Sequence, residues 1–68
     1  MKIKYDSDAD AMYISLRKDK VARTKEIDKN TIIDFNRDGQ VIGVELLFVK
    51  ERNPDILKEL QVENLISA

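Results

Sequence analysis

The stretch "TIIDFNRDGQVIGVELLFV", residues 31–49, alternates apolar and polar side chains on both sides of Asp38-Gly39. A period of two is typical of a strand with one buried face, and Asp-Gly between two such runs favours a tight hairpin turn. With Asp38-Gly39 as a two-residue loop, Ile33 pairs with Val44, and Phe35 pairs with Ile42. One face then carries an unbroken apolar set: Ile33, Phe35, Ile42, Val44, Leu46 and Phe48. The pattern predicts a β-hairpin with strands at 31–36 and 40–49.

The same stretch contains "DFNRDGQVIGVE", residues 34–45, which matches the pattern of an EF-hand calcium loop. Such a loop needs a helix on each side. Here the flanks "KNTII" and "QVIGVELLF" are rich in β-branched residues, which favour strands over helices. A second candidate, "DSDADAMYISLR", lacks the glycine and the final glutamate of the calcium pattern. We therefore interpret the first segment as a hairpin and the second as a polar turn, and we expect no calcium-dependent folding.

Three further strands are predicted before the hairpin. "KIKYD" and "AMYISL" both alternate and are joined by "SDAD", whose side chains favour a turn, and "VARTKEI" forms a weaker strand. The predicted strands therefore cover residues 2–6, 12–16, 21–27, 31–36 and 40–49. Because short connections favour neighbouring antiparallel strands, we expect a β-meander of four or five strands.

The C-terminal segment "NPDILKELQVENLISA" predicts a helix over residues 53–66. Asn53 is a good N-cap, Pro54 suits the first helical position, and Asp55 suits the positive end of the helix dipole. Apolar residues then follow with helical spacing. We expect this helix to pack on one face of the sheet. The fold class is therefore α+β, in a single small domain of residues 1–68 with its sheet in residues 1–49.

Composition narrows the possible functions. The net charge is −1, from 12 basic and 13 acidic residues, so no overall field attracts nucleic acid or anionic lipid. The chain has no histidine or cysteine, which excludes disulfides, disfavours zinc and leaves carboxylates for a hard cation. We expect no cofactor and no metal. The chain has no apolar run of about 20 residues and no apolar signal-peptide region near its start, so we expect a cytoplasmic protein, kept whole.

Four acids form the candidate polar site, because paired carboxylates can perform acid–base chemistry without histidine. They are Asp6, Asp10, Asp34 and Glu45. No nucleophile or pocket is apparent beside them, so we expect no catalytic residue and no enzyme. The basic run at residues 17–25 could contact phosphates, but it contains no aromatic residue that could stack on a base. A solvated strand face is the favoured interpretation of that run, and nucleic acid is disfavoured as a partner.

The segment "VIGVELLFV" is apolar on both faces, and one short helix could cover only one of them. An exposed apolar strand of this length would be an aggregation hazard in a monomer. We therefore expect a homodimer or a higher oligomer, with a candidate interface at Ile32, Val41, Leu47 and Val49. The alternative is that this segment is a central strand within one chain.

Three segments, "YDSDADAMYISL", "TKEI" and "IIDFNRDGQVIGVELL", resemble the small prokaryotic family catalogued as domain of unknown function 2283. The matching positions are Tyr5, Asp6, Ala9, Asp10, Tyr13, Ile14, Leu16, Glu26, Asp34, Gly39, Gly43 and Glu45. The resemblance implies a compact β-sheet with a helix, and it implies no reaction. Members are often encoded beside small toxin-like proteins, which suggests a non-enzymatic interaction module, as an antitoxin-like partner of a small toxin. The alternative is a small carboxylate-based enzyme or a divalent-cation-binding protein.

Overall fold

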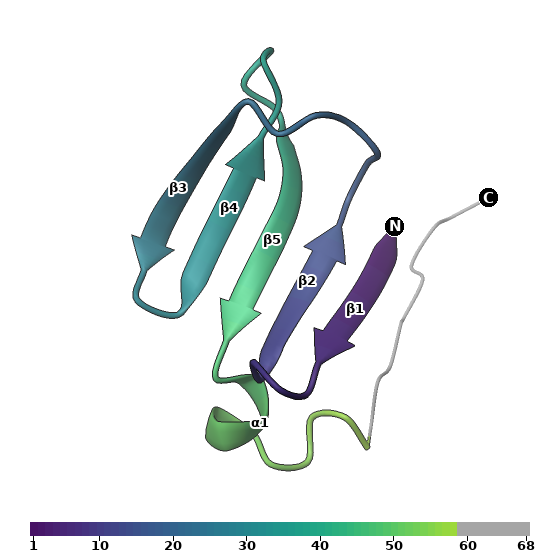
Figure 1. Ribbon diagram of the computed structural model, residues 1–68, viewed down its shortest axis with the longest axis vertical. Coiled ribbons are helices and arrows are strands. Elements are labelled where there is room, and N and C mark those ends of the chain that lie inside the picture. Colours follow the sequence, from purple (N-terminus) through teal and green to yellow (C-terminus); the bar gives the residue numbers. More distant parts are fainter. Residues whose placement is uncertain (59–68) are drawn as a thin grey trace, which may run out of the picture.

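The computed structural model describes residues 1–58, which form a five-stranded antiparallel sheet with a short helix at one end (Figure 1). The elements in chain order are β1 (Lys2–Asp6), β2 (Ala11–Ser15), β3 (Arg23–Asp28), β4 (Thr31–Phe35), β5 (Val41–Leu47) and α1 (Val49–Arg52). The predicted combination of an antiparallel sheet and a C-terminal helix is confirmed in outline. Among the described residues, no helix is long and apolar enough to cross a membrane.

The strand order β1-β2-β5-β4-β3 differs from the predicted meander. The hairpin β1–β2 does not continue into β3, because the connection at residues 16–22 crosses the end of the sheet to its far edge (Figure 1). The amide N–H groups of Leu16 and Ala22 donate to Ile42 O and Phe35 O at 2.9 and 2.8 Å, which anchors both ends of this crossing. As a result β5, which is apolar on both faces, takes the central position and has both of its edges paired.

The β4–β5 hairpin keeps the predicted pairing of Ile33 with Val44, but its turn differs. Asn36 N donates to Gln40 O at 3.0 Å, so the loop has three residues, and Gly39 has a φ of 79°. This is a turn closed by a glycine in the left-handed region, and the predicted two-residue loop is wrong. A bulge in β5 then compensates for the extra loop residue, and the predicted apolar face is preserved.

The C-terminal part of the prediction needs correction. The last strand ends at Leu47, and Phe48, with a φ of 53°, is the N-cap residue that precedes the short helix α1. Residues 54–58 form turns, in which Ile56 N donates to Asn53 O and Lys58 N donates to Asp55 O, both at 3.0 Å. Helix α1 therefore lies directly before the predicted range, and residues 53–58, the described part of that range, are not helical. The remainder of the predicted helix, residues 59–66, lies outside the described residues.

The register gives the sheet two different faces. We define the apolar face by Ile3, Met12, Ile14, Ile33, Ile42, Val44 and Leu46. We define the polar face by Lys2, Lys4, Tyr13, Ser15, Thr24, Asp34 and Glu45. In the described part of the chain, Met12, Ile42 and Val49 are the apolar side chains that are buried. The rest of the apolar face is only partly covered.

Candidate functional site

A tyrosine–aspartate pair crosses the centre of the polar face. Tyr13 OH of β2 donates to Asp34 Oδ2 of β4 at 2.8 Å, and Thr24 Oγ1 of β3 donates to Asp34 Oδ1 at 2.7 Å. The tyrosine ring reaches β4 because Gly43 of the intervening strand has no side chain. A Cβ atom at Gly43 would overlap the Tyr13 hydroxyl and lie 2.5 Å from Cζ of the ring. The small residue is therefore required by a close approach within the sheet.

The environment of Tyr13 holds its hydroxyl in the protonated form. The hydrogen bond to Asp34 raises the pKa of Tyr13 above its ordinary value of 10.0, and burial and the negative charges of Asp34 and Glu45 raise it further. A phenol with a raised pKa is not a base or a nucleophile at neutral pH. The pair and Thr24 connect three strands through hydrogen bonds to one carboxylate.

A second tyrosine–aspartate pair connects β1 to the helix. Tyr5 OH donates to Asp10 Oδ1 at 2.7 Å, and the same carboxylate accepts from Lys50 N at 2.8 Å and from Glu51 N at 3.1 Å. The carbonyl of Asp10 accepts from Val49 N at 3.1 Å. Asp10 thus caps the first turn of α1 from a position 40 residues earlier in the chain. The carboxylate and carbonyl oxygens of Asp10 accept from the first N–H groups of the helix, which explains why the helix begins at Val49.

The structure does not gather the four candidate acids at one point, although Asp6 and Glu45 both line a hollow on the polar face. Asp34 and Glu45 lie near Tyr13 on the polar face, whereas Asp6 and Asp10 lie at the other end of β2. Asp6 Oδ1 accepts from the backbone of Asp8 and Ala9 and so forms the β1–β2 turn. Within residues 1–58, no group of three or more metal-ligating side chains is close enough to hold an ion. The three aspartates accept structural hydrogen bonds.

The "NRDG" turn is organised around Asn36, whose side chain is 4% exposed. Its Oδ1 atom accepts from Asp38 N at 3.0 Å and from Gln40 N at 2.9 Å. Its Nδ2 atom donates to Asp19 Oδ2 at 3.0 Å and to Gln40 Oε1 at 2.9 Å. An amide therefore occupies the centre of the apparent calcium loop, and both flanks are strands. The hairpin interpretation is confirmed.

Three of the four candidate interface residues lie in strands of the sheet, and the fourth lies in the helix. Ile32 and Leu47 are half-buried, Val41 is at the exposed start of β5, and Val49 is only 1% exposed within α1. Val49 was predicted at the end of a strand with an exposed side chain. It is instead buried within the chain, because helix α1 turns its side chain inward, and it adds nothing to the surface.

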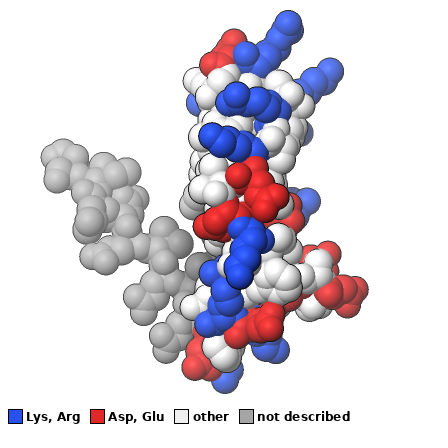
Figure 2. All heavy atoms as spheres, turned by 90° about the vertical axis from the view of Figure 1, so that its left-hand side faces the viewer, with Lys and Arg blue, Asp and Glu red and all other residues white. Residues whose placement is uncertain are grey.

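The basic run at residues 17–25 spreads over the connection and into β3, whose six residues are all exposed. Figure 2 shows the side of the molecule where β3 lies, with basic and acidic side chains both present along it. Charged side chains on an edge strand oppose pairing with another sheet. On this side of the described chain, the surface has no single sign that would favour nucleic acid.

The sequence placed Tyr5 and Tyr13 in predicted strands but did not reveal their role as partners of Asp10 and Asp34. A signal for the Tyr13–Asp34 pair was present in the sequence: Gly43 lies within a strand pattern that is otherwise rich in β-branched and apolar residues. Glycine in a strand interior marks a place where another group approaches closely. No comparable signal was available for Asp10, because its partners are backbone groups far along the chain.

These pairs predict a pH range of maximal stability. Hydrogen bonds from Tyr5 and from the Lys50 backbone N–H lower the pKa of Asp10 below 3.8. Its stabilising contribution is therefore complete above pH 3.8 and is lost as pH falls through the lower folded-state pKa. For Tyr13, with a raised pKa, the contribution is complete below pH 10.0 and is lost as pH rises through the higher folded-state pKa.

We expect the melting temperature, measured by circular dichroism, to fall at both ends of this range. Tyr13→Phe should weaken the alkaline fall and leave the acid fall unchanged, and Asp10→Asn should weaken the acid fall. Equal alkaline falls in Tyr13→Phe and the unaltered chain would contradict the assignment for Tyr13. Equal acid falls in Asp10→Asn and the unaltered chain would contradict the assignment for Asp10.

Comparison with known proteins identifies one family. The model of the protein family of unknown function DUF2283 matches residues 2–50, which is most of the chain and includes both tyrosine–aspartate pairs. No curated protein and no solved structure matches the chain.

Proposed function

The chain belongs to the DUF2283 family of proteins of unknown function, and from that premise we propose that it works by binding another protein chain rather than by catalysis. The apolar face of the sheet is the binding surface. The observation that carries the proposal is the single layer formed by residues 1–58, in which helix α1 reaches only one end of the sheet (Figure 1).

The apolar face supports association because its side chains are incompletely covered. Its half-buried members are Ile3, Ile14, Ile33, Val44 and Leu46. Leu16, which continues the alternation of β2, is 45% exposed. Burial of apolar surface contributes about 25 cal/mol per Å², and a chain of about 60 residues has little stability in reserve. A partner on this face would supply the second layer that a sheet normally needs.

The first partner we propose is a second copy of the chain, giving a homodimer. Both edges of β5 are already paired, so the second copy would not join through that strand. The edge strands carry charged residues, including Lys4 in β1 and Lys25 in β3, which oppose edge-to-edge pairing. Face-to-face packing of two sheets about 10 Å apart remains the favoured arrangement.

A small toxin-like protein is the second partner that we propose for the same face, in an antitoxin-like role. The motivation is the association of the family with neighbouring toxin-like proteins, together with the apolar face. Such a partner would compete with self-association. Co-expression with a neighbouring small protein should therefore yield a mixed complex and a reduced homodimer fraction, measured by mass on a sizing column. Co-expression that leaves the homodimer fraction unchanged would contradict this role.

Light scattering on a sizing column tests the homodimer. We expect about twice the single-chain mass at micromolar concentration. The double variant Ile3→Lys, Leu16→Lys should dissociate, because both substitutions place charge on the apolar face. Val21→Lys is the matched control, since Val21 is 52% exposed in the connection beyond the strands and should leave the mass unchanged.

Leu47→Asp tests the other face of the sheet. Leu47 lies on the side of Tyr13 and Glu45 and belongs to the candidate interface that the sequence predicts. Dissociation by Leu47→Asp, with the double variant still dimeric, would move the interface away from the apolar face. A single-chain mass for the unaltered protein would contradict the homodimer. Circular dichroism of each variant shows whether the strands are retained, so that dissociation and unfolding are distinguished.

A further inference from the structure

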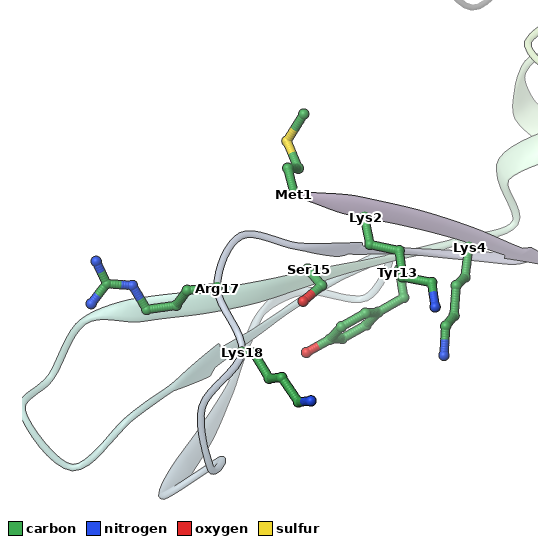
Figure 3. A pocket seen from close by; sticks show the side chains of 7 residues that line it. All are labelled: Met1, Lys2, Lys4, Tyr13, Ser15, Arg17 and Lys18. Atoms are coloured by element: carbon green, nitrogen blue, oxygen red, sulfur yellow. The ribbon is translucent and has the colours of Figure 1, made fainter.

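A hollow of about 470 Å³ lies on the polar face, over β1, β2 and the start of the connection that follows (Figure 3). Basic and hydroxyl-bearing side chains dominate its lining, which consists of Met1, Lys2, Lys4, Tyr13, Ser15, Arg17 and Lys18. No carboxylate contributes to it. This volume lies within the range of about 300–1,000 Å³ that is usual for small-molecule sites.

The register of the first hairpin brings these side chains together. Lys4 lies opposite Tyr13, and Lys2 lies opposite Ser15. All four are therefore on the polar face, since residues paired across two strands share a face. Figure 3 shows Lys18 and Tyr13 extending to the same side of the sheet, while the Met1 side chain points away. The hollow thus combines residues from two strands and a loop.

The cations of the hollow are available to a ligand. In the part of the chain that the structure describes, Lys2, Lys4 and Lys18 have no carboxylate oxygen within ion-pair distance. Arg17 donates through Nη1 to Gln40 Oε1, which holds the guanidinium in place while its remaining N–H groups stay free. Three lysines, with Arg17 at the rim where it also interacts with Asp19, therefore create a local positive potential in a chain whose net charge is −1.

We infer that this hollow binds a small phosphate-bearing anion. Lysine ammonium and arginine guanidinium groups are the usual partners of phosphate oxygens, and Ser15 OH adds a neutral donor. Tyr13 OH already donates to Asp34, so it orients its ring without donating to the ligand. The site goes beyond the proposed protein-binding role, because it lies on the opposite face of the sheet.

A free small ligand fits the hollow better than single-stranded nucleic acid does. Binding of single strands uses aromatic platforms on which bases stack. Tyr13 is the only aromatic side chain that lines the hollow, and its ring lies against Gly43 and is tied to Asp34. Glu45, directly across from Tyr13 on β5, limits the positive region on that side.

Titration with inorganic pyrophosphate, followed by amide chemical shifts at low salt, tests the inference. We expect saturable binding, with shifts concentrated at residues 2–4 and 13–18. Lys4→Ala and Arg17→Ala should each weaken binding by roughly tenfold, which corresponds to about 1.4 kcal/mol. Lys25→Ala is the matched control, because Lys25 is an exposed lysine on the far edge strand, and it should leave the affinity unchanged. Glu45→Gln should strengthen binding, because it removes an opposing charge beside Tyr13.

Three results would overturn the inference. The first is the absence of saturation by millimolar pyrophosphate. The second is an equal loss of affinity in Lys25→Ala and Lys4→Ala, which would indicate non-specific attraction. The third is tighter binding of a short single-stranded DNA than of pyrophosphate, which would identify the ligand as nucleic acid. None of these outcomes depends on the oligomeric state, so this site and the protein-binding proposal can fail separately.

Discussion

Replacing Gly43 with alanine is expected to destabilise the protein by about 2–4 kcal/mol, of which overpacking accounts for about 1–3 kcal/mol. The added methyl group would occupy the position of the Tyr13 hydroxyl and force the ring away from β5. That movement breaks the part-buried hydrogen bond from Tyr13 OH to Asp34 Oδ2, which accounts for about 1 kcal/mol more. Urea unfolding followed by circular dichroism measures the change.

A double-mutant cycle identifies the cause of that loss. In a Tyr13→Ala background the obstructing ring is absent, so Gly43→Ala should cost almost nothing. It could even stabilise by about 0.5–1 kcal/mol, since alanine is favoured over glycine in a strand interior. The two substitutions should therefore show a coupling energy of about 2 kcal/mol or more. An equal cost of Gly43→Ala in both backgrounds would show that the Tyr13 contact is not the reason for glycine.

Replacing Asn36 with alanine should be comparably damaging, at about 2–4 kcal/mol, because one buried side-chain amide makes four hydrogen bonds that would be lost together. The backbone N–H groups of Asp38 and Gln40 would lose their shared acceptor. Asp19 Oδ2 would lose the amide that joins the crossing connection to the β4–β5 turn. Urea unfolding should show the loss. Arg37→Ala, on the exposed neighbour in the same turn, should stay within about 0.5 kcal/mol of the unaltered chain.

The variant Asn36→Asp separates the two functions of the Asn36 amide. It keeps an oxygen acceptor for the two turn N–H groups but replaces the donor with a negative charge facing Asp19. We expect a loss at neutral pH that diminishes as the solution is acidified toward the carboxyl pKa values. The amide of Asn36 is the main reason that the pKa of Asp19 is lowered, so repulsion should be strongest where Asp19 is ionised. A pH-independent loss would contradict the role of the contact with Asp19.

Local patterns in the sequence determined the strands and the composition of their faces. The pairing of Ile33 with Val44 followed from alternation and from the position of the turn, even though the turn type was wrong. A three-residue loop and a bulge at Ile42 each shift the register by one residue in opposite directions. The apolar face was predictable because a net slip of one residue would expose every side chain on it.

The candidate site was predictable only in part. Asp34 and Glu45 share the face of the hairpin that lies opposite the predicted apolar face, which follows from alternation alone. The partner of Asp34 comes from β2, 21 residues away in the chain, and that contact depends on β2 lying beside β5. No pattern within either segment contains that information.

The sequence by itself therefore determined which residues form strands, where the hairpins turn and which side chains share a face, because these properties depend on neighbours close in the chain. Tertiary structure alone decided that β5 lies between β2 and β4, that Asp10 caps a helix beginning at Val49, and that Tyr13 reaches Asp34 across Gly43. Each of these follows from long-range pairing. Strand β5 is the most apolar strand, so a central position between two neighbouring strands buries the most apolar surface. The connection between β2 and β3 crosses the end of the sheet, which allows β2 and β4 to flank β5.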